Sequence, residues 1–232
     1  EHLFFKLSEF RDVLLDWLSE GKEHWRSSVI NFTRNWLKEG LIDRAVTRDL
    51  DWGIEIPREG YENKRMYVWF EAVMGYYSAS VHWAKNQGKP EEWKKWWENE
   101  DSEHYYFMAK DNIPFHTIIW PAMLSGCGYK LPYDVPANEY LLLDSSQFSK
   151  SRRHAIWIPD YLDRYDPELL RFYLASIMPE QKDANFTWED YVTRINTELI
   201  GNYGNLMYRV MSFANKNFPE GLSSNESTLP SL

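Results

Sequence analysis

The sequence of 232 residues predicts an α/β protein whose last third is helical. Residues 104–111, 114–126 and 139–143 have the patterns of a strand, a helix and a strand with short connections, which is typical of a parallel sheet. We expect no strand after residue 145. Because ligands of such sheets bind at the carboxyl ends of the strands, we expect Trp69, Asp111 and the loop 149–152 to lie at one edge of one sheet.

The N-terminal stretch predicts a short strand followed by a helical hairpin. Residues 1–7 are β-prone, and residues 8–21 and 27–42 carry apolar side chains at helical spacing. Ser27 or Ser28 is expected to cap the second helix, and Gly40 to end it. The side chains expected to face inward are Phe10, Val13, Leu14 and Trp17 in the first helix and Val29, Phe32, Trp36 and Leu37 in the second.

The middle of the chain alternates between turn, strand and helix signals. Residues 49–65 predict turns, 66–70 a strand and 71–88 a helix. Residues 91–101 predict a charged, exposed helix, and its stripe of Trp93, Trp96 and Trp97 is expected to dock on the protein.

Helices are also expected further on. Pro114 begins the helix 114–126, because proline is favoured at a first helical position. Asp166 and Thr187 are expected to begin the last helices, over 166–179 and 187–218. The tail 219–232 is low in apolar residues and is expected to be disordered.

Composition limits the possible functions. The net charge of −9 argues against a protein that coats nucleic acid, because such binding depends on many phosphate contacts. The one cysteine, Cys127, excludes an internal disulfide and a cysteine-rich zinc site, and it fits a reducing compartment. No apolar run approaches the length of a membrane span. We therefore expect a cytoplasmic protein with no membrane partner.

A basic turn follows the apolar strand 139–143. Ser149, Lys150, Ser151 and Arg152 supply hydroxyl groups, backbone N–H groups and cations, which suit a triphosphate. No GxxxxGK[ST] stretch is present, so the turn is not a P-loop. By itself this short pattern favours a solvated basic turn over a phosphate site.

Several stretches, in order along the chain, resemble the methionyl branch of the class I aminoacyl-tRNA synthetases. "QFSKSR" (147–152) resembles the KMSKS signature, "YVWFEAVMGYYSAS" (67–80) the YVW-[FLV]-DAPIGY stretch, and "AKDNIPFHTIIWPAML" (109–124) the GKD-x₃-FH-x₃-WPA-x-L stretch. "VTRDLDWG" and "EHLFFKL" also resemble elements of this family. "PANEYL" with "FSKSR" is most similar to its archaeal and eukaryotic-like branch.

The resemblance implies a fragment that follows the zinc-bearing connective insertion of these enzymes. It implies the second half of a Rossmann-type parallel sheet, an α-helical stem-contact segment and the start of a helical anticodon-binding bundle. The expected segments are the end of the insertion with a helical hairpin (1–44), the second half of the nucleotide-binding catalytic domain (45–146), the signature loop with the stem-contact segment (147–186), and the start of the anticodon domain (187–232).

The resemblance also assigns roles to residues. The methionine side chain would be bound by Trp69, Ala72, Tyr76 and His116, with Trp120 in the shell behind them. Asp111 would hold the ATP ribose, and Lys150 and Arg152 the phosphates, while Ser149 and Ser151 would shape the catalytic loop. Asn205 and Arg209, four residues apart on one helical face, would contact anticodon bases, although surface polar residues would show the same pattern.

Four positions depart from the family pattern. Gln147 replaces the first lysine of the signature, and Arg153 stands where a glycine is common, which stiffens the loop. Val73 replaces the proline and Glu71 the aspartate of the DAPIGY stretch. These departures concern the details of the site.

The implied activity is that of a methionine–tRNA ligase, which activates methionine with ATP and Mg²⁺ and transfers it to tRNA(Met). The HIGH signature and the zinc cysteines of the insertion do not occur in this sequence, and no metal site is expected in it. The chain alone is therefore expected to be inactive and to need the N-terminal half as a partner. Two alternatives stay open, namely another class I synthetase for an aliphatic amino acid and a non-catalytic fragment that binds tRNA or a protein.

Overall fold

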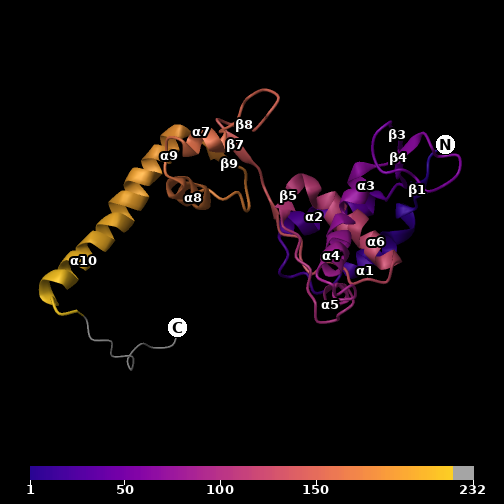
Figure 1. Ribbon diagram of the computed structural model, residues 1–232, viewed down its shortest axis with the longest axis horizontal. Coiled ribbons are helices and arrows are strands. Elements are labelled where there is room, and N and C mark those ends of the chain that lie inside the picture. The colour runs from indigo at the N-terminus through magenta and orange to yellow at the C-terminus, as the bar shows by residue number, and fades with distance from the viewer. Residues whose placement is uncertain (222–232) are drawn as a thin grey trace. The chain divides into compact units, whose positions relative to one another are not determined.

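The computed structural model describes residues 1–221, which form two compact units. Unit 1 comprises residues 1–139, and unit 2 begins at Tyr140 (Figure 1). Each unit has its own apolar core. The tail 219–232 is expected to be disordered, and its residues 222–232 lie outside the described part of the chain.

Unit 1 begins with the strand and helical hairpin that the sequence predicts. β1 (Phe4–Phe5) pairs antiparallel with β2 (Arg44–Ala45). Between these strands lie the 3₁₀-helix η1 (Leu7–Phe10), α1 (Arg11–Trp17) and α2 (Ser27–Glu39). Leu14, Val29 and Leu37 are fully buried, so the hairpin packs into the core as expected.

Some details of the hairpin differ from the expectation. Val13 and Phe32 are exposed, because each helix buries a narrower stripe than the sequence pattern suggests. The cap position of α2 is Arg26, and no side chain caps this helix, so neither serine has the expected role. Gly40 does follow the last residue of α2, and its φ of 99° is a conformation that only glycine adopts easily.

The β-prone run 66–70 is not a strand along its whole length. β3 (Thr47–Asp49) pairs antiparallel with β4 (Lys64–Met66), and β4 ends there. The Tyr67 N–H donates to the Val46 carbonyl at 2.8 Å, and α3 (Val68–Ala72) begins at the next residue. The expected strand over 66–70 is therefore wrong, because packing overrides the β propensity of these residues.

Two helices follow α3. α4 (Gly75–Asn86) forms within the predicted helix 71–88. The expected helix over 91–101 is only the short α5 (Lys94–Trp97). Trp97 is buried, whereas Trp96 is exposed, so only part of the tryptophan stripe docks.

A helical crossover joins two parallel strands in unit 1. β5 (Met108–Ala109) pairs in parallel with β6 (Ala137–Asn138), a strand that ends just before the expected strand 139–143. The connection contains the 3₁₀-helix η2 (Lys110–Asn112), the π-helix η3 (Phe115–Ile119) and α6 (Trp120–Gly126). Pro114 immediately precedes η3, which agrees with the expected start of this helix.

Unit 2 is built on β7 (Leu141–Leu143). This strand pairs antiparallel with β8 (Ser146–Gln147) and in parallel with β9 (Ala184–Phe186). The expectation of no strand after residue 145 is therefore wrong. β8 and β9 are two or three residues long, which is too short to produce a recognisable alternation of apolar and polar residues.

The expected single sheet is also not found within residues 1–221. β5 and β6 form one small sheet in unit 1, while β7 belongs to the separate sheet of unit 2. Trp69 lies on α3 rather than at a strand end. The expectation that Trp69, Asp111 and the loop 149–152 lie at one edge of one sheet is therefore wrong.

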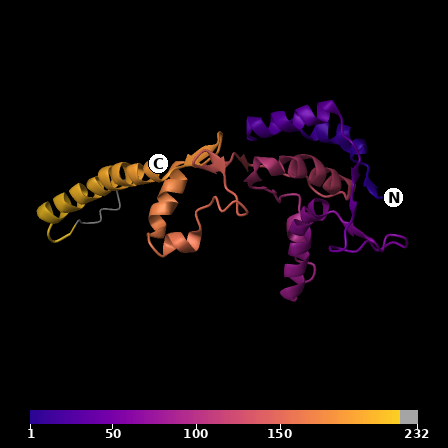
Figure 2. The same cartoon turned by 90° about the horizontal axis from the view of Figure 1, so that it is seen from above.

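Two helices of unit 2 begin where the sequence predicts, after Asp166 and Thr187. α7 (Ile158–Leu162) is followed by α8 (Pro167–Ser176), and the Asp166 side chain accepts the Glu168 N–H at 2.8 Å. α9 (Trp188–Arg194) begins after Thr187, whose hydroxyl accepts the Asp190 N–H at 3.1 Å. α9 continues into the π-helix η4 (Ile195–Gly204) and α10 (Asn205–Asn217), which together form one unbroken rod (Figure 2).

The turn after β8 contains a residue in a left-handed conformation. Arg153 has a φ of 54°, a conformation that costs a non-glycine residue about 1 kcal/mol. In the family pattern that the sequence resembles a glycine is common at this position, and the positive φ is a conformation that glycine adopts without strain.

We predict that Arg153→Gly raises the free energy of unfolding of the chain by up to about 1 kcal/mol, because glycine adopts this φ without strain. Arg152→Gly is the matched control, since it removes the same charge from the same turn at a residue without a positive φ. This control should lower the free energy of unfolding by about 0.5–1 kcal/mol. Urea unfolding followed by circular dichroism measures both, and equal effects of the two substitutions would contradict the prediction.

Candidate active site

Four of the expected methionine-binding residues border a single cavity in unit 1. The cavity has a volume of about 330 Å³ and lies at the carboxyl end of β5. Its walls come from α3, α4, β5, η2 and η3. The lining residues are Trp69, Ala72, Val73, Tyr76, Phe107, Met108, Ala109, Asn112, Phe115 and His116.

The aromatic wall of the cavity is formed by two stacked rings. Trp69 stacks on Phe115 with ring centroids 5.4 Å apart and an interplanar angle of 26°. Trp69 is 48% exposed, so its ring is accessible from the cavity rather than sealed in the core. The convergence of Trp69, Tyr76 and His116 that the sequence predicts is therefore present in the structure.

His116 is fixed in position by hydrogen bonds from both ring nitrogens. Its side chain is buried, with 6% exposure, and Nδ1 lies 3.0 Å from the Asn112 carbonyl oxygen. A carbonyl can only accept, so Nδ1 carries the proton. Nε2 lies 2.8 Å from the Tyr76 hydroxyl, which therefore donates to it. Burial lowers the pKa of His116 and keeps the imidazole neutral.

Trp120, expected in the shell behind the methionine-binding residues, contacts Tyr106, which in turn contacts Tyr76 and His116. It is buried and does not line the cavity. Its indole N–H donates to the Tyr106 hydroxyl at 2.9 Å. Burial raises the pKa of Tyr106 to about 12, so this hydroxyl stays neutral.

Sequence reasoning missed several residues of this region, among them Phe107, Met108 and Ala109 of the lining. Asn112 and Phe115 line the cavity, and Tyr106 supports it from outside the lining. Phe115 could have been found because it precedes His116 directly. Nothing in the aromatic run 105–107 indicates which of its three rings faces inward.

Asp111, expected at the ATP ribose, is exposed in η2 at the end of β5. Its carboxylate accepts a hydrogen bond from the Asn112 side-chain amide at 3.2 Å. Asp111 does not line the cavity, but the next residue, Asn112, does.

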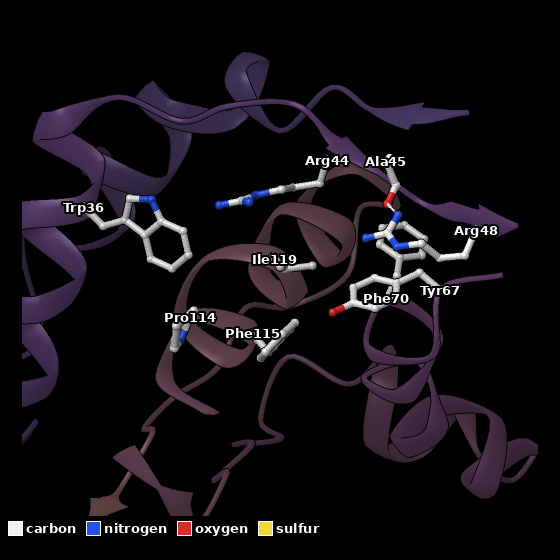
Figure 3. Close-up of a pocket in the computed structure, with 9 residues that line it drawn as sticks. All are labelled: Trp36, Arg44, Ala45, Arg48, Tyr67, Phe70, Pro114, Phe115 and Ile119. Carbon is white, nitrogen blue, oxygen red and sulfur yellow. Dashed lines mark hydrogen bonds between the residues drawn. The ribbon is translucent and has the colours of Figure 1, made fainter. Parts of the chain in front are cut away.

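Unit 1 contains a second cavity of about 240 Å³. Figure 3 shows the residues that line it. Two arginines, Arg44 and Arg48, lie at it together with aromatic side chains. The Arg48 guanidinium lies 4.0 Å from the centroid of the Tyr67 ring and donates to two backbone carbonyls. Phe115 lines both cavities, so it forms their shared wall.

The basic turn of unit 2 is closed by two backbone hydrogen bonds. The Ser149 N–H donates to the His154 carbonyl at 2.9 Å, and the His154 N–H donates to the Ser149 carbonyl at 3.0 Å. The Ser149 hydroxyl accepts the Arg152 N–H at 3.3 Å and lies 3.3 Å from the Ser151 hydroxyl. Lys150 and Arg152 are exposed, so the turn presents cations on an ordered backbone.

The four departures from the family pattern lie in different places. Val73 is buried in the cavity wall, and Glu71 lines a separate cavity in unit 1. Gln147 is exposed on β8, and its carbonyl accepts a long hydrogen bond of 3.5 Å from the Arg152 side chain. Only Val73 therefore touches the cavity directly.

The expected anticodon residues lie on the exposed surface of α10. The Arg209 Nε donates to the Asn205 side-chain oxygen at 3.1 Å. The two side chains therefore share one helical face, as their spacing predicts. Both side chains are exposed to solvent on this face.

Within residues 1–221 we find no cluster of three or more His, Cys, Asp or Glu side chains that could hold a metal ion. In the same part of the chain, every helix is too short or too polar to cross a bilayer.

Comparison with known proteins identifies the family. A family model described as tRNA synthetases class I (M) matches residues 1–211. The methionine–tRNA ligase of Dehalococcoides mccartyi strain 195 is 57% identical over 213 residues, which cover 91% of this chain and 38% of that protein. The methionine–tRNA ligase of Thermomicrobium roseum is 53% identical over 220 residues, covering 94% of this chain and 38% of that protein.

Comparison with solved structures points to the same family. Mycobacterium tuberculosis methionyl-tRNA synthetase in complex with methionyl-adenylate superimposes with a TM-score of 0.77 and 26% identity, over 94% of this chain and 42% of that one. The fold and the sequence together define a class I tRNA synthetase. Within that class the chain belongs to the family of class I tRNA synthetases (M). It spans 38% of the length of each of the two methionine–tRNA ligases described above.

We predict that the free energy of unfolding falls as the pH drops below about 6.5, because the pKa of His116 is lower in the folded chain than in the unfolded chain. Below pH 6.5 the unfolded chain takes up a proton that the folded chain does not, until the pH passes the folded pKa. His116→Gln should therefore flatten part of this pH dependence in urea unfolding at pH 7.5, 6.5 and 5.5. His82→Gln, at an exposed position on α4, is the control and should leave it unchanged. An identical pH dependence in wild type and His116→Gln would refute the prediction.

Proposed function

We propose that this chain is the segment of a methionine–tRNA ligase that holds the methionine side chain and contacts ATP and tRNA(Met). The proposal rests on the methionine–tRNA ligases that it resembles and on the cavity of unit 1. The complete ligase would join methionine to ATP, release pyrophosphate and pass the methionyl group to the tRNA.

The observation that carries the proposal is the convergence of Trp69, Ala72, Tyr76 and His116 on one cavity. A thioether is polarizable and almost apolar, so aromatic faces and a weakly polar contact suit it. The stacked Trp69 and Phe115 supply the aromatic face. The neutral pair of Tyr76 and His116 supplies the weakly polar contact, without a charge that would have to be desolvated.

The same proposal assigns the ATP contacts. Asp111 would accept hydrogen bonds from the ribose hydroxyl groups. Lys150 and Arg152 would contact the phosphates, while Ser149 and Ser151 shape the turn that carries them. Mg²⁺ bound with the triphosphate would supply further charge neutralisation.

Positioning and charge stabilisation would provide the catalysis. A methionine carboxylate oxygen attacks the α-phosphorus of ATP, the bond to the bridging oxygen breaks, and pyrophosphate leaves with the electron pair. A carboxylate is already deprotonated at neutral pH, so this step needs no general base. Lys150 would meet charge that develops on the phosphates in the transition state.

Other parts of the ligase would complete the site. We propose that the HIGH signature comes from an N-terminal half, that zinc belongs to the connective insertion there, and that the purified chain alone does not activate methionine. Residues 1–44 would end that insertion, 45–146 and 147–186 would form the catalytic and stem-contact segments, and 187–232 would begin the anticodon domain with Asn205 and Arg209. The single cysteine fits a cytoplasmic enzyme.

We predict that Trp69→Ala in the complete ligase raises the dissociation constant for methionine at least about tenfold, equivalent to about 1.4 kcal/mol, because it removes the aromatic wall. Trp52→Ala is the matched control, since Trp52 is exposed and does not line the cavity. Calorimetric titration with methionine measures both. If the two variants bind methionine equally well, the cavity is not the methionine site.

We predict that Lys150→Ala raises the barrier to adenylation by about 2–4 kcal/mol and leaves the affinity for methionine nearly unchanged, because the lysine acts on the transition state. Lys182→Ala, at another exposed lysine of unit 2, should have little effect on either quantity. Pyrophosphate exchange by the complete ligase measures the rate, with the purified chain alone as the inactive baseline. An equal loss of methionine affinity in Lys150→Ala would overturn the assignment.

A further inference from the structure

Tyr106 is buried beside the cavity but does not line it. Its side chain is 7% exposed, whereas its neighbours Tyr105 and Phe107 are 49% and 78% exposed. Its backbone N–H donates to the Asp134 carbonyl at 3.0 Å, which fixes the chain just before β5. Tyr106 can therefore influence a ligand in the cavity only through the side chains that it contacts.

Those side chains are Tyr76 and His116, the hydrogen-bonded pair of the cavity. The Tyr106 ring lies edge-on to the Tyr76 ring, with centroids 5.1 Å apart at 70°. It also lies against the His116 ring, with centroids 5.7 Å apart at 47°. Tyr76 is 45% exposed, so a neighbour is needed to hold its hydroxyl in place at 2.8 Å from His116 Nε2.

Tyr106 is itself held by a closed circuit of contacts. Its hydroxyl accepts the Trp120 indole N–H at 2.9 Å, and the Trp120 ring lies edge-on to Trp97 at 6.0 Å. The Trp97 indole N–H donates to the Ser80 hydroxyl at 3.0 Å. The Ser80 hydroxyl donates to the Tyr76 carbonyl at 2.9 Å. The circuit thus returns through α4 to Tyr76, whose ring touches Tyr106.

We propose that Tyr106 is a positioning residue that sets the geometry of the Tyr76–His116 pair, and thereby the preference of the cavity for a thioether side chain. The part that concerns the ligand rests on the proposed function. The part that concerns the pair rests only on the contacts within unit 1.

The preference for sulfur depends on the placement of polar atoms. Norleucine has a methylene group where methionine has sulfur, so the two differ little in size and shape. Sulfur is more polarizable than a methylene group and is a weak hydrogen-bond acceptor, so only a contact of correct distance and direction distinguishes them. Loosening Tyr76 removes that contact while the aromatic wall of Trp69 and Phe115 still accepts both side chains.

The first test uses the purified chain. Tyr106→Leu removes the ring, Tyr106→Phe removes only the acceptor for Trp120, and Tyr105→Leu and Tyr105→Phe are matched controls at the exposed neighbour. NMR follows the titration of the His116 ring, which the spectrum of His116→Gln identifies among the six histidines. The groups that face this ring are Tyr76, Tyr106 and the Asn112 carbonyl.

We expect Tyr106→Leu to move this titration upward by at least about half a pH unit, because water enters and the Tyr76 hydroxyl no longer donates to Nε2. Tyr106→Phe should move it in the same direction by a smaller amount, and the Tyr105 variants should leave it unchanged. If Tyr106→Leu does not fold, the titration of His116 in Tyr106→Phe is compared with that in Tyr105→Phe, and this difference tests the proposal. The proposal is overturned if His116 titrates at the same pH in the Tyr105 and the Tyr106 variants. It is also overturned if the Tyr106 variants melt at a lower temperature while the titration of His116 is unchanged.

The second test measures pyrophosphate exchange by the complete ligase with methionine and with norleucine. We expect Tyr106→Leu to lower the ratio of kcat/KM for methionine to that for norleucine by about tenfold, and Tyr105→Leu to preserve it. An unchanged ratio in Tyr106→Leu overturns the proposal for the ligand. If wild type shows no exchange with methionine, the proposed function fails instead, while the NMR result still decides whether Tyr106 positions the pair.

Discussion

The hydrogen bond between the Tyr76 hydroxyl and His116 Nε2 is the interaction on which the candidate site depends. It joins α4 to η3 across one cavity, through two residues that are 40 positions apart in the chain. It can form because Nδ1 carries the ring proton and donates it in a hydrogen bond to the Asn112 carbonyl oxygen, which leaves Nε2 as an acceptor. Burial favours the neutral imidazole and so maintains this arrangement.

The π-helix η3 explains how consecutive residues can serve the same cavity. Phe115 and His116 both line it, although neighbours on a regular α-helix point in different directions. A π-helical turn is wider than an α-helical turn, and such turns are often found at functional sites. The fully buried Thr117 links η3 to α2, since its hydroxyl lies 2.9 Å from that of Thr33. The position of the cavity wall is therefore tied to the core of unit 1.

Charge in this chain is organised locally rather than globally. Acidic residues exceed basic ones, 35 to 26, and many surface cations are paired with carboxylates, as Arg194 is with Asp190. Lys150, Arg152 and Arg153 stand close together in one turn, and within residues 1–221 none of them forms an ion pair with a carboxylate. A turn of this kind creates a positive potential over a few ångströms, which suits a phosphate ligand even on an acidic protein.

The sequence by itself determined those features that depend on neighbouring residues. The helix starts at Asp166 and Thr187 and the helix end at Gly40 follow from local hydrogen bonds and from the φ that glycine allows. The motifs 67–80 and 109–124 also identified the family and four lining residues of the cavity. Only the tertiary structure decided that residues 68–72 are helical, that β9 pairs with β7 and that Tyr106 faces inward. These features depend on partners far away in the chain, and strands of two or three residues are too short for a periodic pattern to reveal them.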